Sequence, residues 1–385
     1  MSLDFDIVIV GGGLAGMSTA AALQGKGYRL ALLQAAPARA GSASQWDSRI
    51  YAVTPGNVDF LQKIGAWQHM ECGRIAPIHA MRIWGDASSS GAPSLEFDAY
   101  QAGLPELGVI AEEGHMLAAL GHALHEVEIL CPAVGKLIRW ESSNALLQLE
   151  GGREITARLV VGADGGNSWV RQQAGISVEA TPYEQQGVVA NFEVEKPHGG
   201  IARQWFRQDG ILAWLPLPGN RISMVWSAFD QKAQALMALT PEALCCEVAE
   251  AGQHALGALK LITPAAAFPL VMQRNTALIA PRCALVGDAE HRVHPLAGQG
   301  INLGWRDVQE LASTLESGDP GEWSRLRRFE RARKADVLAM QGVTFGLQKL
   351  FNNDLLTLGW LRNTGLSAVN HIAPLKRILM AHAVA

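Results

Sequence analysis

The hydrophobic pattern near the start of the chain predicts a strand, a glycine-rich turn, a helix and a second strand. Residues 5–10 (FDIVIV) form a short apolar run rich in β-branched side chains. Such a run, bounded by glycine, is typical of a buried parallel strand. An Ala- and Leu-rich stretch from Met17 to Gly25 predicts a helix, and residues 28–33 (YRLALL) are again strand-like. The first 34 residues therefore predict a βαβ unit.

Strand patterns dominate the middle of the chain, and helical patterns dominate its end. The further predicted strands lie at 76–100, 127–131, 145–150, 155–162, 183–229 and 277–286. The further predicted helices lie at 49–66, 112–126 and 241–256, and from residue 321 onwards. The chain thus passes from a βαβ unit through antiparallel-looking strands to a second nucleotide-type segment and then to helices.

This order predicts an α/β fold in which a Rossmann-like dinucleotide-binding domain is assembled from separated segments. The predicted segments of that domain are residues 1–75, 101–180 and 277–320. A mostly antiparallel sheet domain is predicted as an insertion at 76–100 and 181–276, and residues 321–385 are predicted as a helical C-terminal segment.

The composition narrows the class of protein. Apolar residues make up 49% of the 385 residues, and charged residues make up 18%, which excludes an intrinsically disordered chain. The net charge of −4 argues against nucleic acid as a partner, because nucleic-acid-binding proteins carry a basic surplus. The five cysteines form no CxxC or CxxH pair, so the sequence predicts a reducing, cytoplasmic location and no metal site.

The turn after the first strand carries the pattern Gly11-x-Gly13-x-x-Gly16. In a strand–turn–helix context, these glycines permit a tight turn, close approach of a pyrophosphate and close packing of helix on strand. The residue expected to bind a ribose hydroxyl lies about 20 positions further on. Gln34 occupies that place at the end of the second predicted strand, and its neutral amide oxygen can accept a hydrogen bond.

Two further motifs follow predicted strands. The first spans 162–171 and contains Asp164 and Gly165. The second spans 287–307, begins with Gly287 and Asp288, and continues as HPLAGQGINLG over 294–304. In this order across most of the chain, the three motifs resemble those of the FAD-dependent aromatic hydroxylases, the class with the p-hydroxybenzoate hydroxylase fold.

The resemblance extends to one subfamily, the ubiquinone-biosynthesis hydroxylases. It rests on Asp47-x-Arg49, on LQKIGAW at 61–67, on 294–304, and on the tail signals FNN at 351–353, RNTGL at 362–366 and PLK at 374–376. The stretch from Ala111 to Met116 departs from the Asn-containing segment that is usual in the family.

The glycine motif and the resemblance together imply a set of site residues. The cofactor-binding residues are Gly11, Gly13, Gly16, Gln34, Arg49, Asp164, Gly165, Gly287, Asp288, Pro295, Gly298, Gly300, Ile301 and Asn302. By resemblance, Asp288 binds the ribityl chain, Asp164 lies near the FAD phosphates, and Arg49 is a charge partner of phosphates. The flavin-edge residues expected to act in catalysis are Pro295, Gly298, Gln299 and Gly300, and no catalytic base is assigned.

The resemblance also implies the reaction. FAD is the bound cofactor, NADH or NADPH is the transient reductant, and O₂ supplies one oxygen atom through a flavin hydroperoxide. The implied substrate is a polyprenylated phenol on the way to ubiquinone. Two alternatives stay open: hydroxylation of a small soluble aromatic, and a non-catalytic flavin-binding member of a quinone-biosynthesis complex.

Several roles stay open on the sequence alone. Trp205, Trp214, Met224 and Trp226 in the inserted sheet are candidates for a substrate pocket or for ordinary core. Arg49 is either a phosphate partner or part of a surface ion pair. Residues 321–385 contain ten Lys/Arg and four Asp/Glu, a surplus of +6 that predicts either contact with the inner membrane surface or a solvated helix face. Other quinone-biosynthesis proteins and a second copy of the chain are candidate partners.

Overall fold

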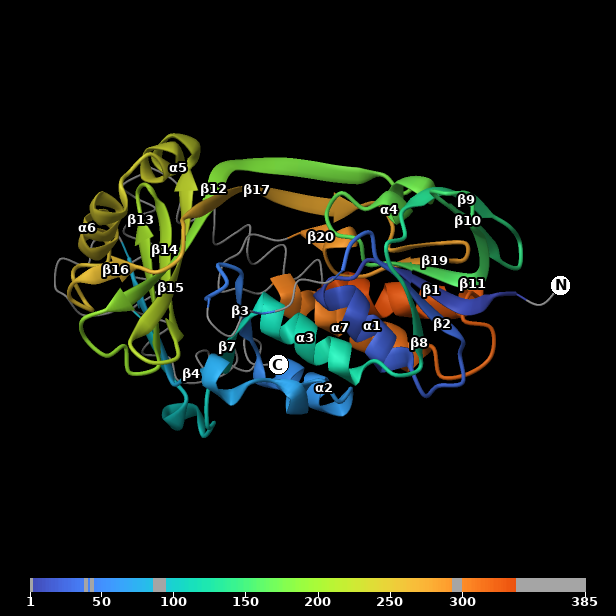
Figure 1. Ribbon diagram of the computed structural model, residues 1–385, viewed down its shortest axis with the longest axis horizontal. Helices are drawn as coiled ribbons and strands as arrows, with labels where there is room; N and C mark the ends of the chain where they lie inside the picture. Colours follow the sequence, from blue (N-terminus) through green and yellow to red (C-terminus); the bar gives the residue numbers. More distant parts are fainter. Residues whose placement is uncertain (1–2, 38–40, 42–44, 86–94, 293–299, 337–385) are drawn as a thin grey trace.

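The computed structural model describes residues 3–37, 41, 45–85, 95–292 and 300–336. Figure 1 shows two lobes joined by two long strands that run along one edge of the molecule. The described residues confirm the predicted α/β class, with a Rossmann-like lobe and a mostly antiparallel lobe.

Five parallel strands form the centre of the first lobe. In spatial order they are β8 (Val127–Leu130), β2 (Leu30–Leu33), β1 (Phe5–Val10), β11 (Glu154–Gly162) and β19 (Cys283–Leu285). Three antiparallel strands complete this sheet: β9 (Gly135–Trp140), β10 (Ala145–Leu149) and β18 (Ile279–Ala280). The predicted βαβ unit is therefore β1–α1–β2, with β1 between β2 and β11.

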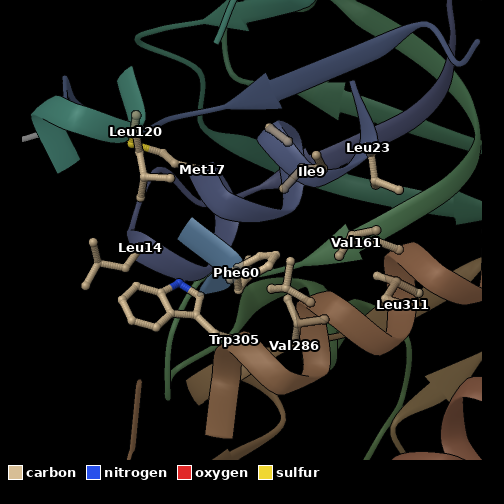
Figure 2. Close-up of a cluster of buried hydrophobic side chains, with 14 of the residues drawn as sticks. Ile9, Leu14, Met17, Leu23, Phe60, Leu120, Val161, Val286, Trp305 and Leu311 are labelled. Atoms are coloured by element: carbon tan, nitrogen blue, oxygen red, sulfur yellow. The ribbon is translucent and has the colours of Figure 1, made fainter. Parts of the chain in front are cut away.

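Helices cover the parallel sheet and enclose the main core. On one face lie α1 (Leu14–Leu23), α3 (Glu113–Ala123) and α7 (Gly300–Thr314), with α2 (Pro55–Lys63) beside α7 (Figure 1). Figure 2 shows the core they form, in which Trp305 of α7 lies against Leu14 of α1. The Trp305 indole also donates a hydrogen bond to Ser18 Oγ at 3.0 Å, which ties α7 to α1. The opposite face carries α4 (Trp169–Gln173) and a second core.

The second lobe is a mostly antiparallel sheet with two helices on one face. Its strands are β5 (Ala80–Trp84), β6 (Leu95–Asp98), β12 (Val178–Val194), β13 (Ile201–Arg207), β14 (Gly210–Leu217), β15 (Arg221–Phe229), β16 (Leu259–Leu261), β17 (Ala266–Asn275) and β20 (His291–Arg292). The helices are α5 (Asp230–Met237) and α6 (Pro241–Ala251). The paired strands β12 and β17 continue from this lobe to the parallel sheet (Figure 1).

A small sheet lies between the two lobes and corrects one expectation. It contains β3 (Ile50–Val53), β4 (Ala76–Ile78) and β7 (Gly108–Glu112). Residues 49–66 were predicted as one helix, but 50–53 form β3 and the helix α2 begins only at Pro55. Proline has no N–H group to donate and is favoured at a first helical position, so it starts α2 and separates it from the strand.

Candidate functional site

The motifs predicted from sequence converge at one edge of the parallel sheet. The glycine turn follows β1, Gln34 follows β2, Asp164 follows β11, and Asp288 follows β19. The carboxyl ends of neighbouring parallel strands meet at one edge, so these four positions are neighbours. In this sheet β1 pairs with β2 on one side and β11 on the other, which makes a topological switch point. Open α/β sheets bind ligands in the crevice at such a point.

Each motif glycine has a distinct steric reason. Gly11 has φ +118°, and a Cβ there would overlap the carbonyl oxygen of Ala163. A Cβ on Gly16 would overlap the Gly11 carbonyl, so this glycine allows α1 to approach the strand closely. A Cβ on Gly13 would meet nothing within 4 Å among the described residues. Gly13 therefore borders open space at the start of α1, where the backbone can approach a ligand.

The N-terminus of α1 suits an anion. Gly13 is the N-cap, no side chain caps the helix, and its first turn contains no acidic residue. The first N–H groups of a helix have no partner inside the helix, and the helix dipole places partial positive charge there. A pyrophosphate fits this position, because it supplies both the missing acceptors and the negative charge.

Asp164 and Gln34 flank that helix terminus. Asp164 Oδ2 accepts a hydrogen bond from Val170 N at 3.1 Å. The other carboxylate oxygen, Oδ1, is buried without a partner among the described residues, as expected for an acceptor that awaits a ligand donor. Gln34 is buried, and its side chain lies against Gly12, where a Cβ would be 2.6 Å from Gln34 Cγ. Gly12 is thus a site glycine that the motif analysis did not single out.

Asp288 lies at the same sheet edge, in the single turn Gly287–Ala289 that follows β19. Its side chain is solvent-exposed. Desolvation nevertheless raises the pKa of its carboxyl group, although the charges of Arg292 and His291 act to lower it. We refer to the crevice at the β1 switch point of the parallel sheet as the cofactor cleft. Desolvation, with the charges of Glu113 and Asp288, strongly raises the pKa of Tyr51, so Tyr51 stays protonated beside these two carboxylates.

Arg49 forms an ion pair with Glu113, the first residue of α3. Its guanidinium donates to Glu113 Oε2 at 3.0 Å, and Tyr51 donates to Glu113 Oε1 at 3.4 Å. Glu113 raises the pKa of Arg49, so the arginine is charged. The ion-pair alternative therefore describes Arg49 in this structure. A phosphate group would have to compete with Glu113 for it.

The stretch that departs from the family pattern supplies both carboxylates that hold the Arg49 segment. Glu112 Oε1 accepts from Asp47 N at 2.6 Å, and its carboxylate is paired with Arg74 at 2.7 Å. Glu113 binds Arg49. Sequence reasoning missed these roles. The available signal was a pair of consecutive acidic residues at the junction of a buried strand and a helix, since Glu112 ends β7 and Glu113 begins α3.

The start of α7 holds the last described site residues. Gly300 is its first residue, and Ile301 packs on the main core. The Asn302 amide accepts from Thr54 N at 3.1 Å and from Asn57 at 3.0 Å, and it donates to Ala52 O at 2.8 Å. This side chain therefore joins α7 to β3 and α2. The expected flavin-edge residues Pro295, Gly298 and Gln299 lie outside the described residues, as does most of the C-terminal segment 321–385.

A buried acidic cluster behind Asp288 does not have the character of a metal site. Glu290, His291 and Asp307 bring ligand atoms within 4.8 Å of one another. However, both oxygens of Asp307 already accept hydrogen bonds, and one of the donors is the guanidinium of Arg333 at 2.7 Å. A cation in this position would face the positive charge of Arg333. The donor set is that of an ion-pair network.

The four pocket candidates of the inserted sheet belong to the core. They are Trp205, Trp214, Met224 and Trp226, each at most 3% exposed. All four face α5 and α6 in one buried cluster. Of the two interpretations left open by the sequence, a substrate pocket or ordinary core, the structure therefore supports ordinary core. Their side chains contact protein on all sides.

Replacing Trp226 tests this assignment. We expect Trp226→Phe to lower the free energy of unfolding by about 1–2 kcal/mol, because it leaves a cavity in the core. Affinity for the cofactor should not change. Urea unfolding and the Michaelis constant for the aromatic substrate are the measurements. Unchanged stability with a several-fold higher Michaelis constant would show that Trp226 lines a pocket instead.

Two protein-family models match the chain, and each is described as an FAD binding domain. One matches residues 6–53 and the other matches residues 140–340. Together with the crevice at the β1–β11 switch point, they define the class: the protein is an FAD-dependent enzyme. The 3-demethoxyubiquinol 3-hydroxylase of Escherichia coli is 36% identical over 390 residues, 98% of each chain. Ubiquinone hydroxylase UbiL of Rhodospirillum rubrum is 34% identical, over 98% of this chain and 89% of that protein.

The chain therefore belongs to the ubiquinone-biosynthesis hydroxylase family, and it is an FAD-dependent aromatic monooxygenase. The solved structure of p-nitrophenol 4-monooxygenase PnpA from Pseudomonas putida shares its fold. The TM-score is 0.81 at 16% identity, over 100% of this chain and 99% of that one. Within the described residues, no helix is long and apolar enough to cross a membrane.

Proposed function

We propose that this chain hydroxylates the aromatic ring of a polyprenylated phenol in ubiquinone biosynthesis, with NADH or NADPH and O₂ as cosubstrates. The observation that carries the proposal is the extent of the similarity to 3-demethoxyubiquinol 3-hydroxylase, which includes 98% of both chains at 36% identity. An alignment of this extent includes the substrate-side lobe as well as the cofactor motifs.

The described residues fit the cofactor. The α1 N-terminus at Gly13 would hold the pyrophosphate. The buried Asp164 Oδ1 would accept a hydrogen bond from a cofactor donor beside the pyrophosphate. Asp288, in the cleft, would accept from the ribityl hydroxyls. When bound, FAD supplies the redox chemistry and the activation of O₂, and the protein supplies binding, orientation and exclusion of water.

A polyprenyl chain partitions into lipid, which bears on where the enzyme works. We propose that the protein meets its substrate at the inner membrane surface as a peripheral protein. The basic surplus of +6 in residues 321–385 supports this, since each Lys or Arg near an anionic surface contributes about 1 kcal/mol. Most of that segment lies outside the described residues.

Oxygen-isotope labelling of the purified FAD-loaded protein tests the reaction. With NADH or NADPH, ¹⁸O₂ and a short-chain prenylphenol, we expect one labelled oxygen atom in the ring product. Flavin reduction and hydroxylation of small phenols, without prenylphenol product, would favour the soluble-aromatic alternative. A flavin that neither NADH nor NADPH reduces would favour the non-catalytic alternative.

A further inference from the structure

The carboxylate of Asp307 joins three segments around the turn that carries Asp288. Asp307 lies two turns into α7 and is fully buried. Its Oδ2 accepts from the backbone N–H of Gly287 at 3.0 Å and from His291 Nε2 at 2.8 Å. Its Oδ1 accepts from Arg333 Nε at 2.7 Å. None of the cofactor roles derived above uses this carboxylate.

The same turn is closely packed on both sides. Gly287 has φ +61°, and a Cβ there would lie 3.0 Å from the Cβ of Ala15 in α1. On the other side, a Cβ on Gly304 of α7 would lie 3.1 Å from the Cα of Gly287. The turn therefore fits between two helices. The hydrogen bond from Gly287 N to Asp307 fixes the Val286–Gly287 peptide, one residue before Asp288.

The burial of this charge points to a geometric role. An ionised carboxylate costs free energy when it leaves water, and buried ion pairs are often no more stabilising than apolar residues of the same volume. Charge-assisted hydrogen bonds are, however, short and directional. Three of them on Asp307 hold the Gly287 peptide, the strand β20 and the helical residues 323–336 in one arrangement.

We propose that Asp307 is a positioning residue for Asp288 and thereby controls how tightly the flavin-bearing half of FAD binds. The inference rests on the proposed function, because it takes the cleft to be the FAD site. The adenosine diphosphate half of the cofactor is served by a separate element, the N-terminus of α1. A defect at Asp307 therefore affects one half of the cofactor and spares the other.

Two dissociation constants, measured on the apoprotein, test this division. Asparagine keeps only one acceptor oxygen, so in Asp307→Asn the N–H₂ group faces a donor on one side, either Arg333 or the pair Gly287 and His291, and the negative charge is lost. We expect the Kd for FAD, from flavin fluorescence quenching, to rise about ten-fold or more, since hydrogen bonds to charged groups contribute about 1.5–3 kcal/mol. The Kd for ADP is measured by competition with FAD, using each variant's own Kd for FAD. It should stay within about two-fold of the wild-type value.

Asp319→Asn is the matched control. Asp319 is the half-exposed partner of Arg282 at 2.6 Å, in the same lobe but outside the cofactor cleft. Both constants should stay at their wild-type values in this variant. If Asp307→Asn does not fold, Gly304→Ala decides the question, because its added methyl presses on Gly287 without changing any charge. It should show the same selective loss of FAD affinity.

Two results would overturn the proposal. One is an unchanged Kd for FAD in Asp307→Asn, or in Gly304→Ala where the first variant does not fold. The other is an equal rise in the Kd values for FAD and ADP, which would indicate general loosening of the lobe. A wild-type protein that does not bind FAD would instead refute the proposed function, so the two failures are distinguishable.

Discussion

Gly13→Asp is expected to weaken FAD binding strongly without destabilising the protein. Gly13 is the N-cap of α1, has extended backbone dihedrals that aspartate adopts readily, and borders open space. Aspartate is a preferred N-cap and complements the helix dipole, so the apoprotein should gain a few tenths of a kcal/mol in unfolding free energy. The new carboxylate would occupy the place of the pyrophosphate. Like charges in contact cost several kcal/mol, so the Kd for FAD should rise about 100-fold or more.

Gly13→Asn separates charge from size in this prediction. Asparagine has almost the same shape and also caps helices, but it is neutral. It should weaken FAD binding much less than Gly13→Asp does. Flavin fluorescence titration and thermal unfolding of both apoproteins are the measurements. A Gly13→Asp protein that keeps FAD affinity within a few-fold of wild type would place the pyrophosphate elsewhere.

The apoprotein is expected to lose about 3 kcal/mol of stability between about pH 6.5 and pH 9, through His291 alone. Burial lowers the pKa of this histidine, but the carboxyl groups of Glu290 and Asp307 outweigh that effect and raise it to about 9. The folded state therefore holds a proton that the unfolded chain releases near pH 6.5. The stabilisation is complete below that pH and is lost as the pH rises through 9. Burial raises the pKa of Glu290 to about 8, so its contribution has the same sign.

His291→Gln isolates the histidine contribution. Glutamine keeps a neutral N–H donor for Asp307 and does not titrate. Urea unfolding of both apoproteins at several pH values gives the comparison. The wild-type free energy of unfolding should fall more steeply than that of the variant across this range. Equal slopes would mean that His291 is neutral in the folded protein.

The cofactor half of the site was predictable because its signals are local. A glycine motif, an acidic residue after a strand and a Gly-Asp turn each require only a strand and a following turn. Parallel pairing then brings the carboxyl ends of β1, β2, β11 and β19 together. Gly13, Asp164 and Asp288 therefore lie at the sheet edge where the motifs predict.

The remaining features depend on contacts between distant segments. The sequence alone could not indicate that Glu113 would pair with Arg49, because β3 was read as part of a helix and its partner β7 lies some 60 residues away. Asp307 and Arg333 are likewise 26 positions apart and meet only through the packing of two helices. The alternating pattern of the strand that contains Trp226 did not indicate which face of the sheet α5 and α6 would cover.

Lipid-quinone mass spectrometry on a strain that lacks the gene for this chain is the most direct test of the proposed hydroxylation. The strain would carry an empty plasmid, the wild-type gene or the Gly13→Asp gene. With the empty plasmid, we expect loss of ubiquinone and accumulation of a prenylphenol one oxygen atom short. The wild-type gene should restore ubiquinone, and the Gly13→Asp gene should not. The position of the missing oxygen would also identify the ring carbon. Unchanged ubiquinone, in a strain without a redundant hydroxylase, would show that this chain does not carry out the proposed reaction.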